Sequence, residues 1–210
     1  MKTVAEIWYS TDRRDWDRAL ERYWEFVQPA NVALERSLEA LDVSRIRDMD
    51  PKAWYDFLHD EYFRWKYTAK NRYATTTKKF REYLDQGVLD ELHDLKERLL
   101  ALPPGNVREG LATACRIRGL GVAGASGLLS LMYPRDYATV DQFIVKALRG
   151  VHGLAEATEL QKMNPEGLTQ RDGVILINLL ARKAAENNRT FARDDWTPRK
   201  IDKVLWTYGR

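Results

Sequence analysis

Cysteine and clustered histidine are the first things missing from this sequence. Its 210 residues include one cysteine, Cys115, and a single thiol excludes both an intrachain disulfide and an iron–sulfur cluster held by four cysteines. The three histidines, His59, His93 and His152, are scattered without the spacing of metal ligands. We therefore expect no metal site in this chain.

The sequence also lacks a long apolar run and a strong charge of either sign. No stretch approaches the roughly 20 apolar residues of a membrane span, and no signal peptide is recognisable. The 34 basic and 31 acidic residues leave a net charge of +3, so binding to nucleic acid would require a local basic face. We expect a cytoplasmic or nucleoid-associated protein without a membrane partner.

What the chain does have is helical periodicity, without an internal repeat. Apolar residues recur at three- and four-residue spacing along most of the sequence. The clearest linker is Pro103-Pro104-Gly105. The predicted fold is therefore all-α, with one helical lobe over residues 1–104, which the C-terminal helices could complete, and a second lobe over residues 105–210.

The most informative stretch is residues 116–148. One apolar helical segment ends at Gly119-Leu120-Gly121, and a second segment of small and apolar residues begins at Val122. The backbone N–H groups of Gly121, Val122 and Ala123 open this second helix without intrahelical partners, so they suit an anion, above all phosphate. The small residues from Ala123 and Gly124 onward would let a neighbouring helix or a nucleic-acid backbone come close. The plain alternative is a helix C-cap followed by a helix start, with no ligand.

Asp141 stands 20 residues after Gly121 (141 − 121), between Thr139-Val140 and Phe143-Ile144. This is the position of a helix N-cap, and an isolated aspartate there is more often a cap than a catalytic group. Its combination with the glycine turn at this separation is much less common than either feature alone.

Gly119-Leu120-Gly121 together with Val140-Asp141 resembles the helix-hairpin-helix DNA glycosylase superfamily, in which a Gly-apolar-Gly hairpin precedes a Val-Asp pair by this distance. The similarity covers about residues 107–149. It implies a two-lobed helical fold with a base pocket between the lobes, and Asp141 as the catalytic residue. It also implies a phosphate site in the hairpin, made by Gly119, Gly121, Val122, Ala123 and Gly124. The iron–sulfur cluster of some members is absent here.

The resemblance implies an enzyme that flips a damaged or modified base out of duplex DNA and hydrolyses its N-glycosidic bond. Asp141 would stabilise the positive charge that develops on the sugar. Members that also cut the strand carry a lysine at the position of Ala123, so a monofunctional enzyme that leaves an abasic site is implied; Lys66 and Lys70 keep lyase activity open. We expect a monomer with no cofactor, apart from the alternative of a monovalent cation on hairpin carbonyls.

Aromatic and basic residues interleave over residues 62–79. Aromatic rings beside cations suit stacking on bases and contact with phosphates. The alternative is a solvated basic helix whose aromatic residues face the core, and the two interpretations weigh equally. The candidates for the base pocket or for DNA contact are Trp65, Lys66, Tyr67, Lys70, Asn71 and Arg72. Aromatic walls would suit alkylated purines, whereas the polar members would suit an oxidised purine or a modified phage cytosine.

Two other functions remain open on the sequence alone. A non-catalytic helix-hairpin-helix protein could bind DNA with Asp141 serving only as a cap, and an all-helical interaction protein could have no nucleic-acid role. The sequence also leaves open whether the enzyme would act in DNA repair or in defence against modified foreign DNA.

Overall fold

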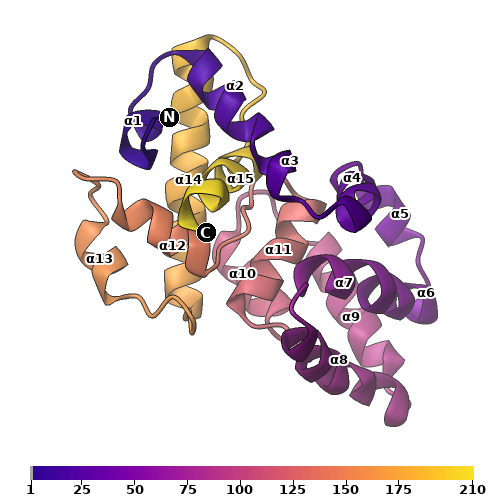
Figure 1. Cartoon of the computed structure of the whole chain (residues 1–210). Helices are drawn as coiled ribbons and strands as arrows, with labels where there is room; N and C mark the ends of the chain where they lie inside the picture. Colours follow the sequence, from indigo (N-terminus) through magenta and orange to yellow (C-terminus); the bar gives the residue numbers. More distant parts are fainter. Residues whose placement is uncertain (1) are drawn as a thin grey trace.

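The computed structural model describes residues 2–210 as helices joined by turns (Figure 1). No strand occurs within this range, which confirms the predicted all-α class. None of these helices combines the length with the apolar composition that crossing a membrane would need. The N-terminal helices are α1 (Val4–Trp8), α2 (Arg13–Glu21), α3 (Tyr23–Phe26), α4 (Val32–Glu39), α5 (Val43–Arg47) and α6 (Pro51–Asp56), with a 3-10 turn, η1, at Pro29–Asn31.

The middle of the chain continues from α6 without a break. A π-helical stretch, η2 (Phe57–Tyr62), runs directly into α7 (Phe63–Lys66), and two longer helices follow, α8 (Lys70–Asp85) and α9 (Leu89–Leu100). The second half of the described chain contains α10 (Val107–Ala114), α11 (Val122–Met132), α12 (Gln142–Arg149), α13 (Ala157–Lys162), α14 (Gln170–Phe191) and α15 (Pro198–Gly209).

The two ends of the chain pack together. Helix α15 lies against α2, α3, α12 and α14, and Figure 1 shows the first helices beside α14 and α15 at one end of the molecule. Trp16 of α2 meets Trp196 edge to face, with ring centroids 5.3 Å apart. Helices α6 to α9 pack among themselves, and α9 also packs against α10, so the segment Pro103-Pro104-Gly105 joins two neighbouring helices.

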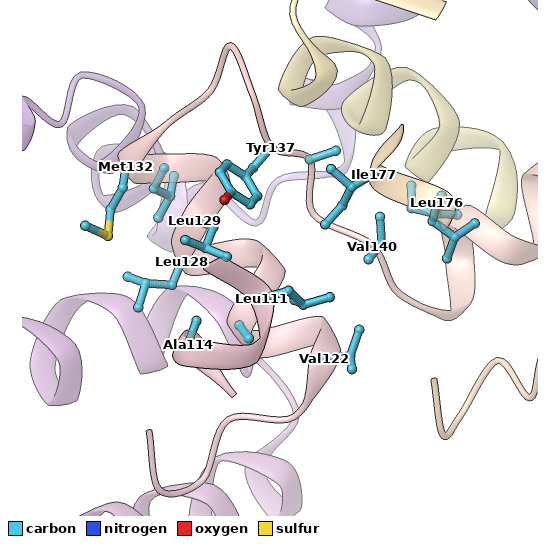
Figure 2. Packing of buried hydrophobic residues seen from close by; sticks show 14 of the residues in the cluster. Leu111, Ala114, Val122, Leu128, Leu129, Met132, Tyr137, Val140, Leu176 and Ile177 are labelled. Atoms are coloured by element: carbon cyan, nitrogen blue, oxygen red, sulfur yellow. The ribbon is translucent and has the colours of Figure 1, made fainter. Parts of the chain in front are cut away.

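Helix α11 is the centre of the core. Every residue from Gly124 to Met132 is buried, and Figure 2 shows Leu128 and Leu129 among side chains of α10 and α14. Burying one such leucine stabilises the fold by about 1.5–3 kcal/mol. Because α11 begins at the glycine turn and leads to the loop before Asp141, its burial fixes both features in one frame.

The two glycines of the turn are required for different reasons. Gly119 has φ +90°, and a Cβ atom there would come within 2.7 Å of the backbone carbonyl oxygen of Thr76 in α8. Gly121 has φ −89° and is the N-cap of α11, and a Cβ atom there would meet no atom within 4 Å. Gly119 therefore serves the fold, whereas Gly121 leaves open space in front of the helix.

This difference predicts opposite outcomes for the same substitution. Gly119→Ala should lower the free energy of unfolding by more than about 1 kcal/mol, because an L-residue is strained at this φ and its methyl group meets α8. The matched control Gly121→Ala should cost less, at most about 1 kcal/mol, because it meets no neighbouring atom and only replaces glycine by a poorer N-cap residue. Thermal and urea unfolding measure both, and equal losses would contradict the assignment.

Candidate functional site

A pocket of about 250 Å³ opens beside Asp141, enclosed by residues of α3, α4, α7, α12 and α15. Its lining combines aromatic rings with a larger number of polar and charged side chains. The aromatic members are Tyr23, Phe26, Trp65, Phe143 and Trp206, and the polar members are Gln28, Asn31, Glu35, Lys66, Thr68, Thr139, Asp141, Arg199, Asp202 and Arg210. Aromatic rings beside converging polar groups are typical of sites that bind and orient a small ligand.

Asp141 is both a helix cap and a wall of this pocket. Its Oδ1 atom accepts a hydrogen bond from the backbone N–H of Phe143 at 3.0 Å, which caps α12. Its Oδ2 atom lies 3.5 Å from Nζ of Lys66, which comes from α7. The Asp141 side chain is 16 % exposed to solvent. The capping role expected for Asp141 is therefore confirmed, and its second carboxylate oxygen faces Lys66 in the pocket wall.

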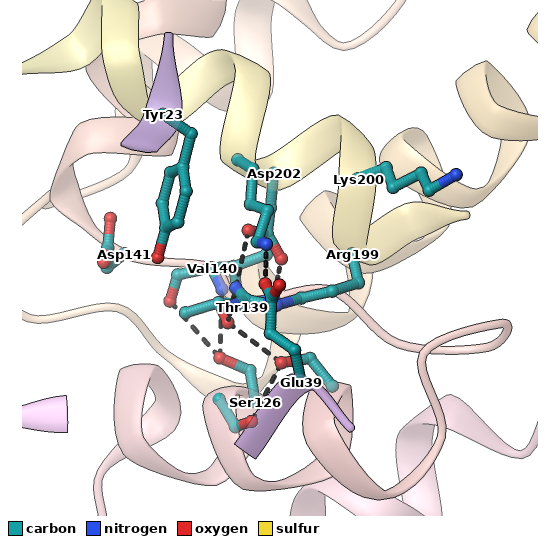
Figure 3. A network of polar contacts seen from close by, with 12 residues as sticks. Tyr23, Glu39, Ser126, Thr139, Val140, Asp141, Arg199, Lys200 and Asp202 are labelled. Carbon is teal, nitrogen blue, oxygen red and sulfur yellow. Dashed lines mark hydrogen bonds and ion pairs between the residues drawn. The ribbon is translucent and has the colours of Figure 1, made fainter. Parts of the chain in front are cut away.

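The two residues before Asp141 are held from opposite sides (Figure 3). The backbone N–H of Thr139 donates to Oδ2 of Asp202 in α15 at 2.7 Å. The backbone N–H of Val140 donates to Oγ of Ser126 in α11 at 3.0 Å. All of these groups are buried, so each hydrogen bond would be costly to lose. The clamp fixes where the chain enters α12, and with it the direction of the Asp141 side chain.

A series of polar contacts and chain neighbours links this clamp to Asp141 through residues that line the pocket. Arg199 donates to Asp202 at 2.9 Å and to Glu35 at 3.2 Å, and Glu35 also accepts the indole N–H of Trp65. Trp65 is followed by Lys66, which faces Asp141. We call this set the polar ring, and its members are Asp141, Lys66, Trp65, Glu35, Arg199, Asp202 and Thr139. Its three carboxylates share two cations, since Lys66 faces Asp141 and Arg199 pairs with both Glu35 and Asp202.

Within the ring, Asp202 has an unusual protonation equilibrium. Burial raises the pKa of its carboxyl group to about 7. Arg199, the Thr139 N–H and Lys66 lower this pKa in part, whereas the negative charge of Asp141 raises it further. Asp202 is 2 % exposed, so solvent hardly screens these effects. The charge of this group therefore changes near neutral pH.

The hairpin leads into the same region through α11. The N-terminus of α11 has no side-chain cap, so the amides of Gly121, Val122 and Ala123 keep the arrangement that suits an anion. Ser126 lies four residues after Val122, about 6 Å along the helix axis. The predicted phosphate site and the clamp before Asp141 are thus carried by adjacent turns of one buried helix.

The small residues of α11 accommodate α7. A Cβ atom at Gly124 would come within 2.3 Å of the hydroxyl oxygen of Tyr67, and one at Gly127 within 2.9 Å of that of Tyr62 and 3.3 Å of Cδ of Lys66. Of the two neighbours expected for this surface, the structure places a helix there. Gly127 lets Lys66 cross α11 on its way to Asp141.

The other sequence-predicted candidates separate into two groups. Trp65 and Lys66 line the pocket, while Tyr67 packs on α11 and stays outside the lining. Lys70, Asn71 and Arg72 form the exposed first turn of α8 and also lie outside the lining. Sequence reasoning missed the residues that α3, α4, α12 and α15 add, chiefly Tyr23, Glu35, Phe143, Arg199, Asp202 and Trp206. The one available signal was Arg199 and Asp202 at helical i, i+3 spacing.

No family model, curated protein or solved structure matches this chain. The resemblance therefore rests on the sequence motif of the hairpin and Val140-Asp141 alone. Among residues 2–210, no group of three or more histidine, cysteine, aspartate and glutamate side chains is arranged to hold a metal ion.

The raised pKa of Asp202 predicts a pH dependence of stability. Because the pKa is higher in the folded protein than the ordinary value of 3.8, this group contributes stability that is present below about pH 4 and is lost as the pH rises through about 7. In Asp202→Asn that contribution should disappear. Urea unfolding from pH 4.5 to 7.5 should show the two stability curves changing their separation. A constant separation would contradict the assignment.

Proposed function

We propose that the protein is a DNA glycosylase that removes a damaged or modified base by hydrolysing its N-glycosidic bond, leaving an abasic site. The supporting observation is the Asp141 carboxylate in the wall of an aromatic pocket, on a segment clamped to the same helix that begins at the glycine turn. In this proposal the partner is double-stranded DNA in the cytoplasm or nucleoid, and the protein acts as a monomer.

The size of the pocket supports a single base as the bound group. A volume of about 250 Å³ is just below the range of about 300–1,000 Å³ that holds drug-sized ligands, which suits one ring system with its substituents. A base stacked in duplex DNA cannot enter such a pocket, so it must be flipped out at a cost of a few kcal/mol. Stacking on an aromatic ring returns about 1–3 kcal/mol per base, and Trp65, Phe143 and Trp206 offer such rings.

The proposed chemistry uses the carboxylate of Asp141. As the base leaves, positive charge develops on the sugar, and a carboxylate held at that face stabilises the charge and orients the attacking water. Oδ1 is occupied by the cap of α12, so Oδ2 is the oxygen that would face the sugar, and it would do so beside the ammonium group of Lys66. The hairpin amides would hold a phosphate next to the flipped nucleotide. Binding of the DNA backbone would then orient the reacting carbon of the sugar toward Asp141.

Asp141→Asn tests this proposal, because asparagine keeps the cap but removes the negative charge. Excision should fall by about 10²-fold or more, while the melting temperature and the affinity for duplex DNA change little. The assay incubates duplexes that carry different modified bases and reveals abasic sites by alkali cleavage. The matched control is Asp42→Asn, which changes the N-cap of α5 in the same way. Full excision by Asp141→Asn would refute the mechanism.

The competing proposal is a helix-hairpin-helix protein that binds DNA without chemistry. The pocket favours the enzyme, since a pure binding module has no use for a base-sized cavity next to an aspartate. If the wild type binds duplex DNA but makes no abasic site on any modified substrate, the binding module is the better description.

The proposal further specifies a monofunctional enzyme. The hairpin offers no amine, because Ala123 stands where strand-cutting members carry lysine. Lys66 is the amine nearest to Asp141, and as an ammonium ion paired with that carboxylate it has no free electron pair for attack on the sugar.

A duplex with a preformed abasic site should therefore stay uncut until alkali is added. Sodium borohydride, which reduces a Schiff base to a stable link, should trap no covalent protein–DNA adduct. An adduct that forms with the wild type and is lost in Lys66→Gln would show instead that Lys66 acts as a nucleophile and that the enzyme is also a lyase.

A further inference from the structure

Helix α8 carries basic side chains without acidic partners. No aspartate or glutamate occurs from Tyr62 to Arg81, whereas seven arginines and lysines do, more than the net charge of the whole chain. Five of these cations are exposed on α8, and within residues 2–210 none of the five has a carboxylate within ion-pair distance, unlike Arg45, Lys52 and Arg118 nearby. The five residues are Lys70, Arg72, Lys78, Lys79 and Arg81.

Two of the five cations border the glycine turn. Arg72 and Lys79 are seven residues apart, so they lie two turns apart on one side of α8, about 10 Å along its axis. Thr76 lies between them, and its carbonyl oxygen is the atom that approaches Gly119. Arg72 is also close enough to Tyr67 for its charge to oppose the rise that burial causes in the pKa of that phenol. Tyr67 in turn covers Gly124 in the first turn of α11.

Lys70 and Arg81 are on a different side of the same helix. They are eleven residues apart, close to three full turns, and they are displaced from the line of Arg72 and Lys79 by about half a turn of the helix. All four side chains are exposed and unpaired with acids. Only the Arg72–Lys79 side therefore continues the surface that begins at the hairpin amides.

We infer that Arg72 and Lys79 bind the phosphates of duplex DNA that flank the phosphate held by the hairpin. This inference rests on the proposed function in one respect, that the ligand of the hairpin is DNA. Charge complementarity favours this partner, since unpaired cations about 10 Å apart beside an anion-binding helix start form a track for a repeating phosphate chain.

The test is the salt dependence of binding to a duplex that carries a non-cleavable abasic-site analogue, measured by fluorescence anisotropy. Each phosphate contact contributes about 0.9 to the slope of log K against log salt. The double variant Arg72→Gln/Lys79→Gln should therefore reduce the slope by about 2. The matched control Lys70→Gln/Arg81→Gln, with the same charge change on the same helix, should leave the slope unchanged.

Several outcomes would overturn the inference. These are an unchanged slope in Arg72→Gln/Lys79→Gln, equal reductions in both double variants, or binding to anionic lipid vesicles that depends on these residues while binding to DNA does not. Circular dichroism and thermal unfolding confirm that each variant is folded.

Failure of this inference is distinguishable from failure of the glycosylase proposal. The salt slope is measured from binding alone, whereas excision is measured with the wild-type protein on modified duplexes, so the two results are independent. A reduced salt slope in a protein that excises no base would support the phosphate contacts and refute the glycosylase.

Discussion

The structure around the pocket depends on one requirement, that charges taken out of water must be paired. Glu35, Arg199 and Asp202 are each less than 9 % exposed, and each satisfies the others' charge through the ion pairs of the polar ring. Such a ring adds little net stability compared with an apolar core, but removal of one member costs about 3–5 kcal/mol, because a buried charge is left alone. The polar ring therefore acts mainly on geometry, because α4, α7 and α15 must pack in the arrangement that pairs these charged groups.

Two series of contacts connect these ion pairs to Asp141. One passes through Asp202 to the backbone of Thr139, and the other through Trp65 to Lys66 and its contact with the carboxylate. Helix α11 provides the frame between them, since Ser126 holds Val140 and Gly127 makes room for Lys66. The position of one side chain is thus determined by helices from widely separated parts of the sequence.

The all-α class, the glycine turn, the N-cap at Asp141 and two residues of the pocket lining could be predicted from the sequence, because each depends on local spacing or local backbone chemistry. The polar ring could not. Glu35 and Arg199 lie on amphipathic helices, where a charged residue normally marks the solvent face, and only tertiary packing turns them inward. Tyr67 shows the opposite case, a residue expected in the pocket that lies outside it. Its neighbours Trp65 and Lys66 line the pocket, but the helix ends at Lys66 and the ring of Tyr67 packs on Gly124. Periodicity does not indicate such a change of direction.

The pairing of the chain's first and last helices has a consequence for biosynthesis. Tyr23 and Glu35 emerge early from the ribosome, but their partners Arg199, Asp202 and Trp206 emerge only after α14 has been made. Until then Glu35 has no counter-ion, and the wall that α15 provides is missing. A nascent chain therefore lacks a formed pocket, and the site around Asp141 is complete only after the last helix has been made.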